Sequence, residues 1–193
     1  MKKILFLILF ACSLSLCAKQ KIAVVDMQKV FSGYDKTKAL ELKMNEQVKV
    51  YQEYAAKLLQ EYRAIESECK RLRDDSMNLT LSEAERESRK RSFLSKTEEI
   101  KRKEQEINEY NRSRQKLLKE QFDKKRAEVV AEIRQVVSNK CMLEGWTMAL
   151  DKSGITLNDL PIVIYNDSSA DITQSVLDDL NRAYRTGKKE KSE

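Results

Sequence analysis

Two pairs of adjacent acidic residues, Asp74–Asp75 and Asp178–Asp179, are side chains whose types could support acid–base catalysis. Both pairs fall in segments with a helical pattern, where adjacent side chains point in different directions and do not converge on one bond. The sequence contains no histidine, which removes the most frequent general base and the most frequent metal ligand. We therefore predict that the protein is not an enzyme and uses neither a metal nor another cofactor.

Cysteine is the other residue type that could carry chemistry. Cys69 and Cys141 lie in helical segments that place them tens of ångströms apart, on the order of several times the ~7 Å between Cα atoms that a disulfide allows. Cys69 occupies an apolar repeat position, which favours a small buried side chain. A reactive thiol at Cys69 is the alternative.

The first 18 residues have the pattern of an export signal. Lys2 and Lys3 precede the apolar run ILFLILFACSLSL, which is too short to span a bilayer, and polar sequence follows it. We predict that residues 1–18 are a signal peptide that is removed after export. Cys12 and Cys17 leave a lipid-anchored form open as an alternative.

The charge pattern argues against a nucleic-acid partner. The formal net charge is +6, but the basic residues are interleaved with acidic ones along the chain. Such mixing favours solvated helix faces over a dense basic surface. A basic protein that binds nucleic acid or anionic lipid head groups is therefore the weakest of the functional alternatives.

The middle of the chain has the composition of long helices, because neither glycine nor proline occurs between Gly33 and Gly145. Apolar residues recur at alternating spacings of four and three between positions 41 and 75, which is the pattern of a coiled-coil seam. The predicted seam residues of this first helix are Met44, Val48, Tyr51, Ala55, Leu58, Tyr62, Ile65, Cys69 and Leu72.

A second long helix is predicted to return antiparallel to the first. The apolar repeat stops after Leu72, and Ser82 followed by Glu85 has the spacing of a capping box, so we place a turn near residues 77–82. In the returning helix the seam residues are Phe93, Ile100 and Ile107, and the next two places of that repeat hold Arg114 and Gln121.

Strand-forming segments occur only near the two ends of the chain. KIAVV begins at Lys21, whereas WTMAL and PIVIY begin at Trp146 and Pro161. A lone strand cannot satisfy its own backbone groups, so we expect all three segments to form one small sheet, with the final helix packed on it. The predicted body core and oligomerisation residues are Ile22, Val24, Val25, Val30, Phe31, Trp146, Met148, Leu150, Ile162, Ile164, Val176, Leu177 and Leu180.

The predicted fold class is α+β, with a long antiparallel α-helical coiled-coil hairpin projecting from a small β-sheet body. We assign residues 19–34 and 145–185 to the body with its C-terminal helix, residues 35–144 to the hairpin arm, and residues 186–193 to a disordered charged tail. A body of this size buries little apolar surface alone, so oligomerisation is expected.

Motifs at both ends resemble the Skp/OmpH family of periplasmic chaperones. They are KIAVVDMQKVF near the start, and DKSG, PIVIYND and DITQSVLDDLN near the end. The resemblance implies a homotrimer in the periplasm of a Gram-negative-type bacterium that holds unfolded outer-membrane proteins between its arms without ATP. It gives structural roles to Ile22, Val24 and Val25, to Asp26, Gln28, Val30 and Phe31, to residues 162–165, and to residues 171–173.

The partners expected from this resemblance are further copies of the chain and unfolded outer-membrane proteins. An anionic membrane surface is kept as a further partner, although the predicted turn is acidic. A structural coiled-coil scaffold or adaptor of the cell envelope, without client binding, is the main alternative function. The candidate client contacts are Tyr54, Tyr110, Arg89, Arg91, Lys101 and Lys103.

Overall fold

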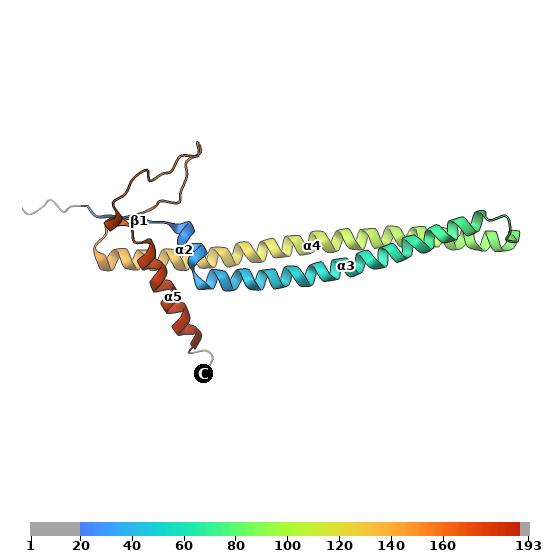
Figure 1. Ribbon diagram of the computed structural model, residues 1–193, viewed down its shortest axis with the longest axis horizontal. Coiled ribbons are helices and arrows are strands. Elements are labelled where there is room, and N and C mark those ends of the chain that lie inside the picture. The colour runs from blue at the N-terminus through green and yellow to red at the C-terminus, as the bar shows by residue number, and fades with distance from the viewer. Residues whose placement is uncertain (1–19, 190–193) are drawn as a thin grey trace, which may run out of the picture. The chain divides into compact units, whose positions relative to one another are not determined.

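A computed structural model describes residues 20–189, so the predicted signal peptide and the lipidation alternatives lie outside the described residues. The described chain divides into two compact units. The terminal unit contains residues 20–38 and 127–189, and the hairpin unit contains residues 39–126. Figure 1 shows the elements in chain order from β1 to α5.

The first strand, β1 (Ile22–Val25), pairs in parallel with β2 (Met148–Asp151). Ile22 lies opposite Met148, and the backbone N–H of Ile172 donates to the carbonyl of Val24 on the other edge of β1, at 2.9 Å. Both edges of β1 are therefore occupied by segments from the far end of the chain. This pairing explains how an isolated N-terminal strand satisfies its backbone.

A short helix, α2 (Met27–Gly33), follows β1 directly. The carboxylate of Asp26 accepts the N–H of Lys29 at 2.8 Å, which caps the first turn. The helix ends at Gly33, where a Cβ atom would lie 2.8 Å from Cδ2 of Leu177. A larger residue at position 33 would have to displace the Leu177 methyl group that packs there.

The last helix, α5 (Thr173–Lys189), is tied to the break between α2 and α3. The side-chain carbonyl of Asn181 accepts the N–H of Asp35 at 2.8 Å, and the Arg185 guanidinium lies 2.8 Å from the Asp35 carboxylate. The ring of Tyr184 meets that of Tyr34 edge to face, with centroids 5.9 Å apart. Val176 and Leu180 are buried on the same side of α5.

The core of the terminal unit gathers around Tyr34 and Ile133, which are almost fully buried. In α4 (Glu83–Glu144), buried residues recur every four positions at Val129, Ile133, Val137 and Cys141, which is the spacing of one helix face. The hydroxyl of Tyr34 donates to Glu132 at 2.7 Å. Burial is the main cause of a raised pKa for Tyr34, and this hydrogen bond raises it further.

The C-terminal end of α4 is a Schellman turn. Gly145 has a φ of 71°, and the N–H of Trp146 donates to the carbonyl of Cys141 at 2.9 Å. The turn redirects the chain into β2.

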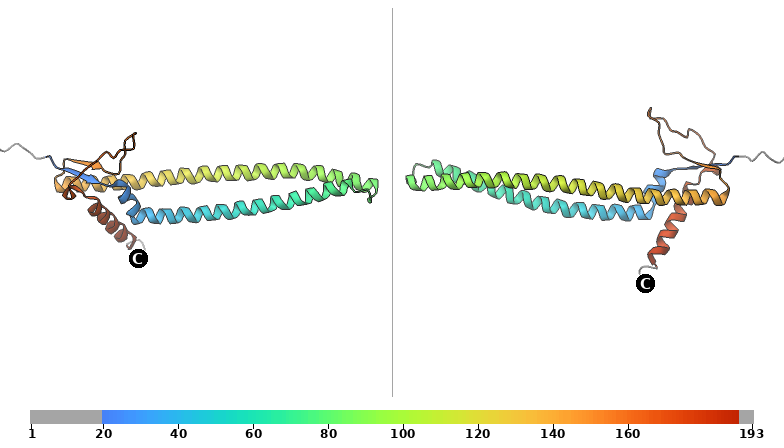
Figure 2. Two further views of the ribbon diagram at one scale, coloured as in Figure 1. Left: turned by 45° about the horizontal axis from the view of Figure 1, so that its top comes forward. Right: turned by 180° about the vertical axis from the view of Figure 1, so that it is seen from behind.

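The hairpin unit, residues 39–126, contains most of α3 (Asp35–Met77) and the larger, first part of α4. The two helices run antiparallel in the views of Figures 1 and 2. Residues 78–82 connect them. The capping box is confirmed, because the N–H of Ser82 donates to the Glu85 carboxylate at 3.0 Å and the Glu85 N–H donates to the Ser82 hydroxyl at 3.4 Å.

Two details of the predicted terminal unit are wrong. Residues 162–165 form no strand, since the sheet has two strands and an isolated bridge joins Ile155 to Pro161. Within one copy both edges of β1 are already taken, so PIVIY does not pair there. In addition, α5 continues to Lys189 and so includes residues 186–189 of the predicted tail. Residues 190–193 lie outside the described residues.

The predicted fold class is confirmed at the level of its elements. The chain contains a long helical hairpin and a small sheet built from its N- and C-terminal segments. Across residues 20–189, no helix is both long and apolar enough to cross a membrane.

Candidate functional site

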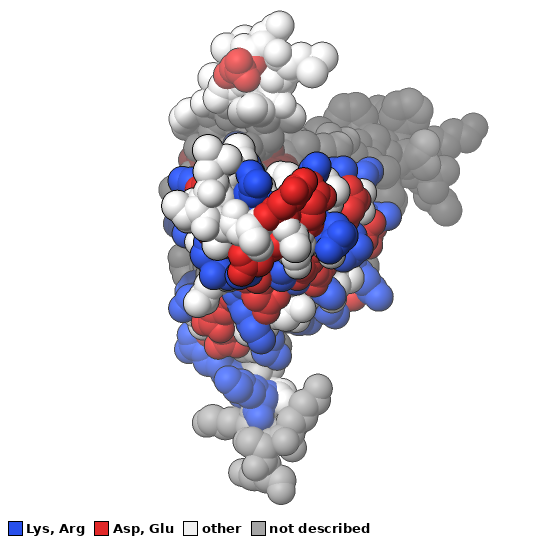
Figure 3. Space-filling model, turned by 90° about the vertical axis from the view of Figure 1, so that its right-hand side faces the viewer, with Lys and Arg blue, Asp and Glu red and all other residues white. Residues whose placement is uncertain are grey.

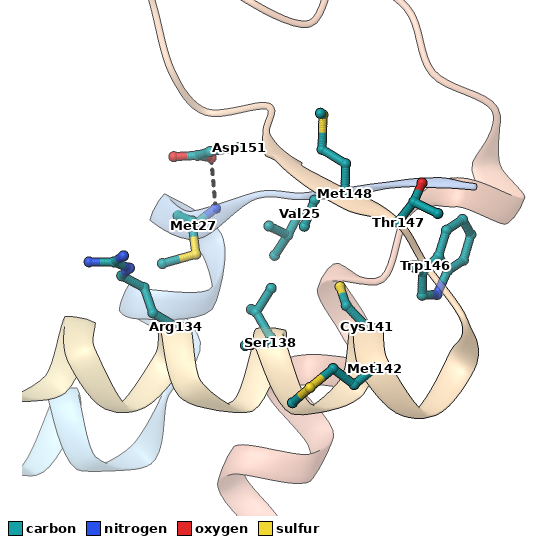
Figure 4. Close-up of a pocket in the computed structure, with 12 residues that line it drawn as sticks. Val25, Met27, Arg134, Ser138, Cys141, Met142, Trp146, Thr147, Met148 and Asp151 are labelled. Carbon is teal, nitrogen blue, oxygen red and sulfur yellow. Dashed lines mark hydrogen bonds between the residues drawn. The ribbon is translucent and has the colours of Figure 1, made fainter. Parts of the chain in front are cut away.

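A cavity of about 590 Å³ lies in the terminal unit between the sheet and the last turns of α4. Figure 4 shows Val25 and Met27 facing Ser138 and Cys141 of α4 across this space, with Trp146 at one end. The N–H of Met27 donates to the Asp151 carboxylate at 3.1 Å, which joins the end of β1 to the end of β2. We refer to this space as the β2 cavity.

Cys141 lines the β2 cavity, and Cys69 lies in the hairpin unit; both are buried free thiols. Burial raises the pKa of Cys141, and the nearby Glu144 carboxylate adds to this effect. A raised pKa lowers the fraction of thiolate, so Cys141 is a poor nucleophile at neutral pH.

The second strand has an unpaired outer edge, because β2 pairs only with β1 among the described residues, and all four residues of β2 are exposed. After β2 comes a segment, residues 152–166, that we call the apolar strap. It appears in Figure 1 as a long loop. Its exposed large apolar residues are Ile155, Leu157, Leu160, Ile162, Ile164 and Tyr165.

The apolar strap has a defined internal structure. The N–H of Thr156 donates to the carbonyl of Leu160 at 2.8 Å, and the N–H of Ile162 donates to that of Gly154 at 3.0 Å. Asp159 lies in the tight turn between Thr156 and Leu160 and has a φ of 58°, in the left-handed region. The strap therefore presents its apolar side chains from an ordered loop.

A polar cluster joins the strap to the sheet and to α5. Lys152 forms an ion pair of 2.7 Å with Asp171, and the Asp171 carboxylate also accepts the N–H of Thr173 at 3.0 Å. The hydroxyl of Thr173 accepts the N–H of Asp26 at 2.9 Å. Burial opposes ionisation of Asp171, but the bonds from Lys152 and Thr173 outweigh it and lower the Asp171 pKa to about 2.

The predicted body residues divide into three groups. Val24, Val25, Val30, Val176 and Leu180 are buried, and Phe31, Trp146 and Leu177 are half-buried. The remaining five are exposed within one copy of the chain: Ile22, Met148, Leu150, Ile162 and Ile164. The core residues that the sequence reasoning did not single out include Ala23, Tyr34 and Ile172. Local periodicity gave no signal for Tyr34, which is buried by contacts with distant elements.

The predicted seam residues lie along one face of α3. Leu58, Cys69 and Leu72 are buried. The half-buried members are Met44, Val48, Tyr51, Ala55, Tyr62 and Ile65 on α3, with Phe93, Ile100 and Ile107 on α4. The hairpin unit therefore has few fully buried side chains along its length.

Charged residues of α4 also lie in the seam. Nζ of Lys103 is 2.9 Å from the Glu61 carboxylate, and Nζ of Lys96 is 2.9 Å from that of Glu68. We call these two contacts the ion-pair ladder. They recur after seven residues on each helix, in opposite chain directions, as an antiparallel coiled coil requires.

The candidate client contacts occupy two kinds of environment. Lys103 is bonded to Glu61 and Glu106, with only 17% of its side chain exposed. Tyr110 is half-buried; its ring lies 4.8 Å from that of Tyr54 and its hydroxyl donates to the Tyr51 carbonyl at 3.5 Å. The others are exposed: Tyr54, Arg89, Arg91 and Lys101.

Charges of both signs cover the end of the hairpin where α3 meets α4. Figure 3 views the molecule from that end, and acidic and basic side chains are intermingled there. This arrangement agrees with the acidic sequence of the turn and offers no dense basic patch at that end.

The adjacent acidic residues do not form a catalytic pair. Asp74 pairs with Arg73 at 3.1 Å. In α5, Asp178 accepts the Gln174 amide at 2.9 Å, whereas Asp179 pairs with Lys140 at 2.8 Å. Asp178 and Asp179 are thus directed at different partners.

Similarity to a known protein family covers most of the described residues. The family model described as outer membrane protein (OmpH-like) matches residues 21–180, from the start of β1 into α5. No curated protein matches the sequence of this chain.

Proposed function

Because the chain belongs to the OmpH-like family of outer membrane proteins, we propose that it is a holding chaperone of the bacterial periplasm. It keeps unfolded outer-membrane proteins from aggregating and releases them without ATP. The family resemblance supplies the class of client, and the surface of the hairpin unit supplies the physical basis for binding it.

The observation that carries this proposal is the distribution of apolar side chains over the hairpin unit. Exposed apolar residues are scattered singly among charges, as at Leu42, Val50, Leu59 and Leu94. Many weak contacts of this kind exchange quickly, whereas one deep pocket slows release. Tyr54, Arg89, Arg91 and Lys101 are exposed and available for such contacts.

The chaperone acts as a homotrimer in this proposal. The exposed edge of β2 and the apolar strap supply a self-association surface, because unpaired strand edges and clustered apolar side chains favour pairing with another chain. The trimer brings several hairpins around one axis, and a cavity for the client requires that arrangement. Native mass measurement tests it, and a monomer would contradict it.

The holding activity is tested by light scattering. A urea-unfolded outer-membrane protein is diluted into buffer with and without the purified chain lacking residues 1–18. We expect the chain to suppress aggregation in the absence of ATP. Aggregation at the same rate in both samples would remove the chaperone proposal and leave the envelope scaffold as the better hypothesis.

A further inference from the structure

The hairpin unit contains a groove of about 460 Å³ between α3 and α4. Its apolar lining is formed by Met44 and Val48 of α3 with Leu118 and Phe122 of α4. The polar lining residues are Glu41, Asn45 and Lys119. The groove is open to solvent. We call it the hairpin groove.

The hairpin groove lies in the part of the hairpin where the seven-residue apolar repeat of α4 is interrupted. After Phe93, Ile100 and Ile107, the next two places of the repeat hold Arg114 and Gln121. Leu118 and Phe122, which lie outside this repeat, supply the apolar side chains of α4 that line the groove.

Arg114 lies on α4 four residues before Leu118 and contacts two tyrosine rings. Its guanidinium lies 5.3 Å from the ring centre of Tyr51 and 5.3 Å from that of Tyr110. Its Nε atom is buried without a hydrogen-bond partner among the described residues. Arg114 and Leu118 are one helical turn apart, about 6 Å along α4, and Arg114 itself is not among the residues that line the groove.

The basic excess of the hairpin unit is concentrated around this groove. Between Arg112 and Arg126, α4 carries seven basic residues and two acidic ones, and the facing segment 41–53 of α3 carries two basic and three acidic. The remainder of the unit, residues 55–109, carries thirteen of each sign. Arg112, Lys119 and Lys124 form no ion pair with any residue of the described chain.

Apolar lining residues between helical segments with a net positive charge complement one kind of ligand. We propose that the hairpin groove takes an apolar side chain of an unfolded polypeptide at a site where its neighbours are aspartate or glutamate. The inference rests on the proposed chaperone function, and it names the chemical class of client segment that this part of the hairpin selects.

The direct test uses two labelled peptides and fluorescence anisotropy. One peptide alternates glutamate with phenylalanine and leucine, and its counterpart has lysine in place of every glutamate. We expect the full mature chain to bind the acidic peptide more tightly, and the binding to weaken as salt rises. Equal binding of both peptides, or no binding of the acidic one, would overturn the inference.

Two variants locate the binding at the groove. Val48→Phe places a larger apolar side chain in the groove. The double variant Lys119→Glu with Lys124→Glu, which we call the rim variant, reverses two basic charges at and beside the groove. Since exposed charge pairs contribute about 0.2–1 kcal/mol each, the double reversal should weaken binding of the acidic peptide by roughly threefold or more. The matched control is Arg63→Glu with Lys70→Glu, which changes the net charge equally at exposed positions elsewhere on α3.

The same proteins are then compared in the light-scattering assay. If the unmodified chain suppresses aggregation and the groove variants suppress it equally well, the groove inference fails while the chaperone function stands. If the unmodified chain does not suppress aggregation, the chaperone function fails, and the peptide measurement still decides whether the groove binds. Circular dichroism checks the fold, and the rim variant keeps the test valid if Val48→Phe does not fold.

Discussion

The Nζ atom of Lys103 on α4 lies 2.9 Å from the Glu61 carboxylate on α3, so the pair joins the two long helices. One heptad toward the turn, Lys96 and Glu68 repeat the contact. Hydrogen bonding to Glu106, and then to Glu61, raises the pKa of Lys103, while the bond from Lys103 lowers that of Glu61. Both groups are therefore ionised throughout the neutral range.

Reversing the charge of one residue in the ion-pair ladder should lower the thermal stability of the hairpin unit, by an amount that depends on the salt concentration. We expect Glu61→Lys to lower the thermal midpoint at low ionic strength, because it opposes two cations across the seam. The double variant Glu61→Lys with Lys103→Glu should recover most of the loss. The difference in thermal midpoint between Glu61→Lys and the unmodified chain should shrink in about 1 M salt, where the screening length falls to roughly 3 Å.

Circular dichroism at low and high salt measures these midpoints. A loss in Glu61→Lys that is unchanged by salt, or that the double variant does not recover, would contradict an electrostatic role for this pair.

Acid should destabilise the terminal unit through Asp171. Its pKa is lowered from 3.8 in the unfolded chain to about 2 in the folded one, so its contribution to stability is complete above about pH 4 and is lost as the pH falls toward 2. A pKa shift of this size corresponds to about 2 kcal/mol in the free energy of unfolding. Asp171→Asn keeps an acceptor for Thr173 but removes the charge that pairs with Lys152.

Urea unfolding at a series of pH values checks this expectation. Asp171→Asn should be less stable than the unmodified chain at pH 7, and the difference should vanish near pH 2. A difference that is the same at both pH values would show that the carboxylate charge is not responsible.

The apolar strap should be required for assembly and not for folding of one copy. Ile164 and Tyr165 are 91% and 85% exposed, so Ile164→Lys with Tyr165→Lys removes no intramolecular contact of consequence. We expect the native mass of this double variant to fall to that of one chain, with an unchanged helical circular dichroism spectrum. Retention of the unmodified mass would exclude this part of the strap from the interface.

The end of α4 should depend on glycine at position 145. Because Gly145 has a φ of 71°, Gly145→Ala should destabilise the terminal unit by about 1–2 kcal/mol, although an added Cβ meets no atom within 4 Å. Gly145→Asn should destabilise the terminal unit less than Gly145→Ala does, since asparagine tolerates a positive φ better than alanine.

The matched control for this substitution is Gly187→Ala in α5, where an added Cβ also meets nothing. This change should be neutral or stabilising, because alanine favours a helix by about 1 kcal/mol over glycine. Similar losses for both alanine variants in urea unfolding would contradict the role given to the backbone conformation at Gly145.

The sequence alone was sufficient for the helical hairpin. The spacing of Met44, Tyr51 and Leu58 indicated the face of α3 that is at least half-buried, and Ser82 with Glu85 marked where α4 begins. These features could be predicted because they depend on contacts between residues within a few turns of one another.

Only the tertiary structure decided which distant segments meet. The parallel pairing of Ile22 with Met148, and the absence of a third strand at 162–165, depend on competition among segments for the same backbone groups. Lys103 was expected to be a surface residue for clients, but the register of the two helices places it against Glu61. Local sequence carries no record of that register, because it is set by contacts across the hairpin between residues 42 positions apart.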